Sequence, residues 1–181
     1  IGIFLFGQSC DCNGGNLLES VPEIESWSIP ELTSTVHVLR TEMNIPHIYA
    51  ENELDLYRVQ GFVMARDRYV QFELGRRFGQ GIVSELLGNI GLPIDQQSRG
   101  RGMRHIAKRL WNSANEGQRA KIEAFAQGIN GFIREVHAGK LPVPSELDFI
   151  APLLGVDSPS QLMHEVSGED VMGMAAVVVS Q

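Results

Sequence analysis

An apolar stripe with helical spacing between residues 122 and 136 constrains the fold more than any other feature of the sequence. The i, i+3, i+4, i+7 spacing places its members on one face of an α-helix: Ile122, Phe125, Ala126, Ile129, Phe132, Ile133 and Val136. Ser113 and Glu116 have the spacing of a capping box at the start, and Gly139 suits the position after the end. We expect a long helix that packs one face against a core.

A second long helix is predicted from Glu53 to about Phe78. Asn52 is a favourable N-cap, and Asp55 follows it three residues later, as in a capping box. Apolar residues occupy more than one face of this segment, which indicates a mostly buried helix. Gly61 and Gly75 would each weaken an isolated helix by about 1 kcal/mol relative to Ala, so we expect close backbone packing to compensate.

The second helix also carries charged residues, and charges on a buried helix have to be paired or have to reach solvent. They are Arg66, Asp67, Arg68, Glu73, Arg76 and Arg77. Glu73 and Arg77 have the favourable i, i+4 spacing for an ion pair. We interpret the charges as an internal ion-pair network that fixes the helix against its neighbours, rather than as catalytic groups.

Two short β-prone runs between residues 36 and 50 flank residues 42–44 and predict a β-hairpin. Asn44 is the expected left-handed turn residue, because its short amide side chain tolerates a positive φ. Pro46 confines the second run to a sheet edge or to the start of a strand. Together with the helices, this predicts an α+β fold that is mostly helical, with a β-hairpin near its N-terminus.

The remaining segments predict loops and one short helix. Residues 89–102 contain three glycines and a proline, and they are expected to form a loop. A helix is expected at residues 103–111. Residues 140–159 contain four prolines and apolar residues without a period, which predicts an ordered connector on the surface of the core.

A last helix is expected after Ser167, which pairs with Asp170 in the manner of a cap. Its body, residues 171–179, is apolar all round, and such a helix is buried on every side. A domain that ends in a helix of this kind indicates that the sequence has been cut or that a second chain covers the helix.

Residues 7–34 are rich in Gly, Ser, Asn, Pro and Glu and lack an apolar period. We interpret residues 1–34 as a leader or tether and expect the packed fold to begin near Thr35, so that residues 35–181 form the folded unit. The opening residues Ile-Gly-Ile-Phe-Leu-Phe, without an initiator Met, are typical of the end of a signal-peptide apolar region. This predicts export to the periplasm or to the medium.

Cys10 and Cys12 are the only cysteines. The run from Gly7 to Cys10 has a loose similarity to a lipoprotein cleavage site, where Cys10 would be lipidated; the alternative is two incidental thiols in the leader. A Cys-x-Cys pair is cramped for a disulfide and incomplete as a zinc site. No chemistry is assigned to either residue.

The charge pattern and the apolar runs exclude two classes of partner. The net charge is −7, from 22 acidic and 15 basic side chains that we interpret as interspersed, so nucleic acid is not an expected partner. The longest apolar runs, residues 1–6 and 171–179, are shorter than the roughly 20 residues that a transmembrane helix needs. No membrane span is expected.

The residues alone indicate no self-contained active site. The five histidines lack metal-ligand spacing, and neither a Gly-x-Ser-x-Gly elbow nor a phosphate-cradling glycine loop is present: His37, His47, His105, His137 and His164. We assign no catalytic residue and no metal ligand in this segment. The residues by themselves therefore predict a mostly helical, exported domain.

An ordered series of motifs resembles the start of the α subunit of the penicillin acylase family. The motifs are Val38-Leu39-Arg40, Asn44-Ile45-Pro46-His47-Ile48-Tyr49-Ala50, Asp55-Leu56-Tyr57, Gln60-Gly61-Phe62, Ala65-Arg66-Asp67-Arg68, Gln71-Phe72-Glu73, Arg76-Arg77, Gly79-Gln80-Gly81, Glu85-Leu86-Leu87-Gly88, Gly128-Ile129-Asn130-Gly131 and Glu169-Asp170-Val171. The resemblance covers about residues 36–181. Two positions depart from it, since Asn44 stands where Gly is usual and Arg66 where Gln is common.

The resemblance implies an N-terminal nucleophile hydrolase whose precursor cuts itself into an α chain, a spacer and a β chain. The αββα fold would be completed by that β chain, whose first residue is the nucleophile and whose freed α-amine is the general base. The substrates would be small N-acyl compounds, such as β-lactams with acyl side chains or acyl-homoserine lactones. This segment alone would be inactive.

The resemblance also implies a role for the last helix. Val179 and Ser180 fall where the family begins to line the acyl-group pocket, and a core position is an equal alternative for Val179. The sequence would end before the remaining pocket residues and a calcium-binding carboxylate, so that calcium belongs to the complete protein. An alternative function of another class is a non-catalytic helical binding domain that docks a partner through the last helix.

Overall fold

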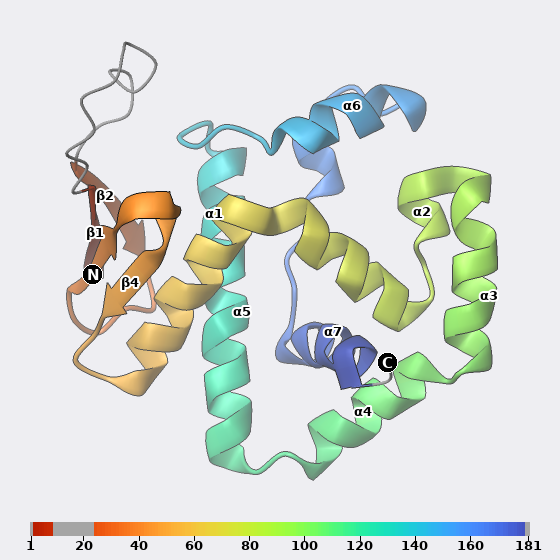
Figure 1. Ribbon diagram of the computed structural model, residues 1–181, viewed down its shortest axis with the longest axis horizontal. Helices are drawn as coiled ribbons and strands as arrows, with labels where there is room; N and C mark the ends of the chain where they lie inside the picture. Colours follow the sequence, from red (N-terminus) through yellow and green to blue (C-terminus); the bar gives the residue numbers. More distant parts are fainter. Residues whose placement is uncertain (1, 9–23, 180–181) are drawn as a thin grey trace.

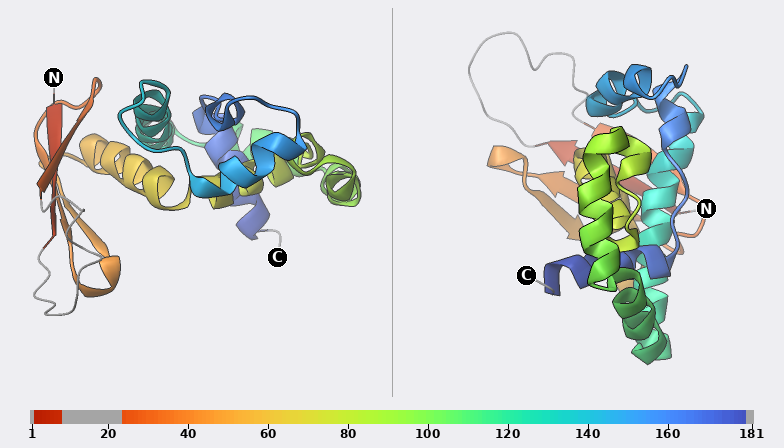
Figure 2. Two further views of the ribbon diagram at one scale, coloured as in Figure 1. Left: turned by 90° about the horizontal axis from the view of Figure 1, so that it is seen from above. Right: turned by 90° about the vertical axis from the view of Figure 1, so that its right-hand side faces the viewer.

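The computed structural model describes residues 2–8 and 24–179, and it consists mainly of helices with a four-stranded sheet at one end of the molecule (Figures 1 and 2). The mostly helical α+β prediction is confirmed. The elements in chain order are β1 (Gly2–Gln8), β2 (Ile24–Ile29), β3 (Val36–Arg40), η1 (Glu42–Asn44), β4 (Pro46–Tyr49), α1 (Glu53–Gln80), α2 (Ser84–Leu87), η2 (Gly88–Gly91), α3 (Leu92–Gly100), α4 (Met103–Ser113), α5 (Glu116–His137), α6 (Ser145–Leu153), η3 (Pro159–Leu162) and α7 (Gly168–Val179).

The sheet has the strand order β2-β1-β3-β4. β1 pairs antiparallel with β2 and parallel with β3, and β3 pairs antiparallel with β4, so that the predicted hairpin is present. Its turn has positive φ at Asn44, as expected, and also at Met43. The side chain of Met43 is 88% exposed. The pattern of the sequence did not indicate this second left-handed residue, because a Met rarely adopts that conformation.

The structure differs from the expectation that packed structure begins near Thr35. Backbone segments 2–8 and 24–29 form strands β1 and β2, and the side chains of Ile29 and Leu32 are buried in the core. The expectation was wrong here because strand pairing between distant segments leaves little trace in local composition. Residues 9–23, with Cys10 and Cys12, lie outside the described residues.

Helices α1 and α5 cross at close range and form the centre of the core (Figure 1). A Cβ atom on Gly61 would lie 2.1 Å from the carbonyl oxygen of Phe125, and one on Gly128 would lie 1.8 Å from that of Arg58. Close packing at Gly61 is therefore confirmed, and glycine is required on both helices. Helix α1 has non-helical backbone angles at Arg68, where it changes direction.

Asn52 caps α1 as predicted, since its side chain accepts a hydrogen bond from the backbone N–H of Asp55 at 2.8 Å. The predicted cap of α5 was wrong by two residues. Asn115 and Gln118 form the capping box there. Ser113 belongs instead to the last turn of α4, where its hydroxyl donates to the carbonyl of Leu110 at 2.9 Å, and it is therefore unavailable to α5.

Two segments predicted to lack helices contain one each. α3 lies within the expected loop 89–102, and α6 lies within the expected connector 140–159. Pro93 is compatible with α3 because it occupies the first turn, where no N–H is needed. Asp95 of α3 accepts hydrogen bonds from the backbone of Val83 and Ser84, at 2.6 and 3.0 Å. Tertiary hydrogen bonds of this kind are not visible in local composition.

Helix α7 lies between α1, α4 and α5 (Figure 1). Its predicted cap is present: Asp170 accepts from the backbone and hydroxyl of Ser167, and Ser167 accepts from the backbone N–H of Asp170. The helix is not buried on every side by the described residues, because Val171, Met172 and Met174 are only half-buried. No helix among the described residues is long and apolar enough to cross a membrane.

Candidate functional site

One of the two residues predicted to line a substrate pocket belongs to α7. The backbone of Val179 forms the last residue of that helix, and Ser180 lies outside the described residues. The placement of α7 therefore decides where this part of the chain points. The contacts that hold α7 come from α1, α4 and α5.

A contact between two glycines brings α7 directly against the backbone of α1. A Cβ atom on Gly79 would lie 2.5 Å from the carbonyl oxygen of Gly173 and 2.8 Å from its carbon. Gly75, one turn earlier, faces only the side chain of Met174, at 3.3 Å from its Cγ. The close packing expected at Gly75 is therefore found at Gly79 instead, and it fixes the distance between the two helices.

Buried charges on α1 hold the start of α7. Glu73 is 1% exposed, and it accepts hydrogen bonds from Arg76 at 2.6 and 2.8 Å and from Arg77 at 2.7 Å. Arg76 Nη1 lies 3.8 Å from Asp170 of α7, and the side-chain amide of Gln80 donates to the same carboxylate. The predicted Glu73–Arg77 pair is confirmed, and Arg76 joins it. Arg68 differs from the prediction, because its side chain is exposed and donates to Gln71 at 3.2 Å.

Arg76 keeps its charge although its side chain is buried. Burial alone would lower the pKa of Arg76, but the hydrogen bonds and charge of Glu73, with the charge of Asp170, outweigh burial and raise that pKa. The sequence indicated a partner within α1 for these charges but not Asp170, which is far away along the chain. The Asp170 contact makes the network a clamp between α1 and α7.

A second ion pair fastens the hairpin to α1. Arg40 is 7% exposed, and its Nη2 atom donates to both carboxylate oxygens of Asp67, at 2.8 and 3.0 Å. Its Nη1 atom donates to the backbone and side-chain oxygens of Asn44, at 3.2 and 3.1 Å. Three of the motif residues thus meet at one point, where they serve a structural purpose.

Asp55 joins the start of α1 to the segment between β2 and β3. Its buried carboxylate accepts hydrogen bonds from the backbone N–H and hydroxyl groups of Thr33 and Ser34, and from the amide of Asn52. Burial would raise the pKa of Asp55, but the hydrogen bonds from Thr33, Asn52 and Ser34 outweigh it and hold that pKa well below its ordinary value. Asp55 is therefore ionised in the folded chain at neutral pH.

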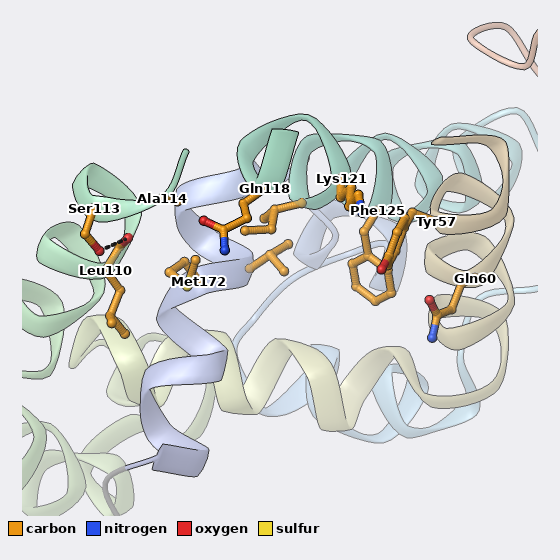
Figure 3. Close-up of a pocket in the computed structure, with 11 residues that line it drawn as sticks. Tyr57, Gln60, Leu110, Ser113, Ala114, Gln118, Lys121, Phe125 and Met172 are labelled. Atoms are coloured by element: carbon orange, nitrogen blue, oxygen red, sulfur yellow. Dashed lines mark hydrogen bonds between the residues drawn. The ribbon is translucent and has the colours of Figure 1, made fainter. Parts of the chain in front are cut away.

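A cavity of about 700 Å³ opens beside the first turns of α7, between that helix and α1, α4 and α5 (Figure 3). Apolar and amide side chains dominate its lining, among them Tyr57, Gln60, Leu110, Phe125 and Met172. Its cation, Lys121, is paired with Glu53 at 2.9 Å. The cavity suits an apolar group. The hydroxyl of Ser113 in its lining donates a hydrogen bond to the carbonyl of Leu110 rather than to a base.

The described residues also offer no fit for calcium. Among residues 2–8 and 24–179, no group of three or more His, Cys, Asp or Glu side chains is placed to hold a metal ion. A calcium site in the complete protein would therefore need carboxylates from outside the described ranges.

Comparisons with known proteins give a consistent result. The sequence model of the family described as penicillin amidase matches residues 35–177. A penicillin acylase 2 proenzyme from Pseudomonas sp. (strain SE83) is 35% identical over 143 residues, which are 78% of this chain and 17% of that protein. An acyl-homoserine lactone acylase, QuiP, from Pseudomonas syringae pv. tomato is 28% identical over 139 residues, which are 77% of this chain and 17% of that protein.

The fold is that of a solved relative. A thermostable penicillin G acylase from Alcaligenes faecalis superposes with a TM-score of 0.61 at 23% sequence identity, over 77% of this chain and 69% of that chain. The chain spans about one sixth of the length of the curated relatives it matches. The family match covers most of the chain and includes the hairpin, α1, α5 and α7, so this chain belongs to the penicillin amidase family.

Proposed function

We propose that this chain is the α-subunit part of an amide hydrolase that removes the acyl group from small N-acyl compounds. The catalytic residue would be the first residue of a β chain cut from the same precursor. The family match and the resemblance to penicillin and acyl-homoserine lactone acylases support the reaction class. The name of one relative, a proenzyme, supports a precursor.

The observation that carries the proposal is that α7 is held firmly at its start but is incompletely covered. This helix is clamped at its start by Arg76, Gln80 and Gly79, yet its apolar side chains are only half-buried by the described residues. A rigidly held helix with an uncovered apolar face is suited to complete a pocket with another polypeptide segment. In this proposal Val179 and Ser180, at its end, line part of the pocket for the acyl group.

The chemistry would be divided between the two chains. In the β chain, the free α-amine accepts the proton of the nucleophilic hydroxyl as its oxygen attacks the amide carbon. The C–N bond then breaks, and the same proton passes to the leaving amine. Water hydrolyses the resulting ester and releases the carboxylic acid. The α chain would bind and orient the acyl group and exclude water from it.

The substrate class follows from the acylase relatives and from the apolar character of α7. A β-lactam with an acyl side chain and an acyl-homoserine lactone both present an amide next to an apolar group, which fits a pocket lined by an apolar helix. We further propose export to the periplasm or the medium, and calcium bound by carboxylates outside the described residues. No step of the reaction is assigned to calcium.

The test uses the full-length protein expressed from its gene. We expect two chains on a denaturing gel, release of the carboxylic acid from an acyl-homoserine lactone or from penicillin G, and loss of both processing and activity when the new N-terminal nucleophile is replaced by Ala. A reading frame that stops at Gln181, or activity in an uncut single chain, would contradict the proposal. The first of these outcomes would favour the helical binding domain.

A second variant tests whether the α chain contributes to substrate binding. Asp170→Asn removes the negative charge that Arg76 and Gln80 hold, and we expect a raised KM, because α7 is no longer fixed at its start. Glu169→Gln, on the neighbouring exposed residue, is the matched control. Equal KM values for wild type and Asp170→Asn in a processed enzyme would contradict a pocket role for α7.

A further inference from the structure

Basic residues are concentrated in one stretch of this acidic protein. Residues 96–115 contain five of the 15 basic residues and none of the 22 acidic ones: Arg99, Arg101, Arg104, Lys108 and Arg109. This corrects the interpretation that charges of both signs are interspersed along the whole chain. The stretch covers the end of α3 and all of α4, and it is a candidate for binding an anion.

Helix α4 directs these charges to solvent. Met103 and Ala107 are buried where α4 packs on α7, whereas Arg104 and Lys108 are exposed. Among the residues that the structure describes, none of the five basic side chains forms an ion pair with a carboxylate. The apolar side of α4 is therefore occupied, and its charge is not neutralised within the described fold.

Some of these cations surround a cavity rather than a flat surface. Helix α3 is followed directly by α4 (Figure 1). A cavity of about 700 Å³ lies at this junction, and its lining includes Arg99, Arg104, His105 and Lys108. Arg104 and Lys108 are one helical turn apart, so both reach it from one face of α4. Arg99 reaches it from the end of α3, and its Nε atom donates to the carbonyl of Gly81 at 2.9 Å, which orients the guanidinium.

We propose that this α3–α4 cavity binds a phosphate group through Arg99, Arg104 and Lys108. Two guanidinium groups and one ammonium around one cavity match the double charge and the several acceptor oxygens of a phosphate monoester better than a singly charged carboxylate. The phosphate belongs to a free ion or to the headgroup of an anionic lipid. The two sources present the same group to the cavity, and the experiment separates them.

Lys108 is the more decisive of the two α4 residues. Arg104 also lines a neighbouring smaller cavity, whose lining includes the acidic residues Glu169 and Asp170. Asp170 is already engaged by Gln80 and Arg76. Lys108 lines only the larger of these two cavities, so its ammonium has no competing carboxylate there.

The test measures binding to the full-length protein at constant ionic strength. Inorganic phosphate is titrated by calorimetry with chloride as the exchanged ion, and vesicles of phosphatidylcholine with or without phosphatidic acid are tested by co-sedimentation. In whichever of the two assays shows binding, we expect Lys108→Gln to lower the affinity about tenfold. This is the loss typical of one hydrogen bond to a charged group. Arg109→Gln is the matched control, because Arg109 lies on the same helix but does not line the cavity.

The outcomes are distinct. Saturable binding of inorganic phosphate that Lys108→Gln weakens and Arg109→Gln does not supports the proposal with a free phosphate as ligand. Binding to phosphatidic acid vesicles alone, with the same dependence on Lys108, supports it with a lipid headgroup as ligand. Binding in neither arm, or equal loss in the two variants, overturns it. Amide hydrolysis is a separate readout, so the proposed function stands or falls independently.

Discussion

Arg40 of β3 donates to both carboxylate oxygens of Asp67 on α1, and the same guanidinium holds the turn residue Asn44. One side chain thus links strand, turn and helix. Because Arg40 is 7% exposed, removal of Asp67 leaves the guanidinium charge with little water around it.

Replacement of Arg40 by Leu should therefore lower the free energy of unfolding by about 2 kcal/mol, since Asp67 loses its partner and Asn44 loses a donor. Urea unfolding of Arg40→Leu, Asp67→Asn and the double variant measures the coupling. The control is Arg68→Leu, on an exposed neighbour. Additive losses in the double variant would show that the pair is not coupled.

Gly79→Ala tests the close approach of α1 and α7. The added Cβ would lie 2.5 Å from a backbone oxygen of Gly173, so α7 has to move, and we expect a loss of about 1–3 kcal/mol in stability. Gly75→Ala is the matched control, because its Cβ meets only the flexible end of Met174 and it gains helix propensity. Thermal unfolding of the two variants should rank Gly79→Ala well below Gly75→Ala, and the reverse order would refute the contact.

The start of α5 offers a test of which residue caps it. Asn115→Ala removes the hydrogen bond to the backbone of Gln118 and should cost about 1 kcal/mol. Ser113→Ala breaks only a bond within the last turn of α4 and should change stability by less than about 0.5 kcal/mol. Chemical denaturation of both variants decides between the observed cap and the one expected from sequence.

Asp55 predicts a pH dependence of stability. Its folded pKa lies below the unfolded value of about 3.9, so it stabilises the fold above that pH, and the contribution is lost as the pH falls below about 4. The stability of the wild type should therefore fall more steeply below pH 4 than that of Asp55→Asn, as followed by urea unfolding at a series of pH values. Parallel curves for the two proteins would contradict this assignment, and Asp157→Asn, on an exposed residue, provides the baseline.

The features that were predicted correctly depend on residues close together in the sequence, whereas those that were missed depend on distant residues. The α1 cap at Asn52, the left-handed turn at Asn44 and the pairing of Glu73 with Arg77 involve residues within four positions of each other, and all three were predicted correctly. Asp170 lies 90 residues from its partner Gln80, so no spacing rule links them. The same reason explains why β1 and β2 were not foreseen.

The sequence by itself determined the two long helices, the hairpin and the family, because apolar periodicity, caps and ordered motifs are properties of neighbouring residues. Tertiary structure alone decided that α3 and α6 are helical, that Gly79 rather than Gly75 meets α7, and that the cations of α3 and α4 gather around one cavity. These features depend on groups that approach in space after the chain has folded. Local propensities are too weak, at a fraction of a kcal/mol per residue, to specify them in advance.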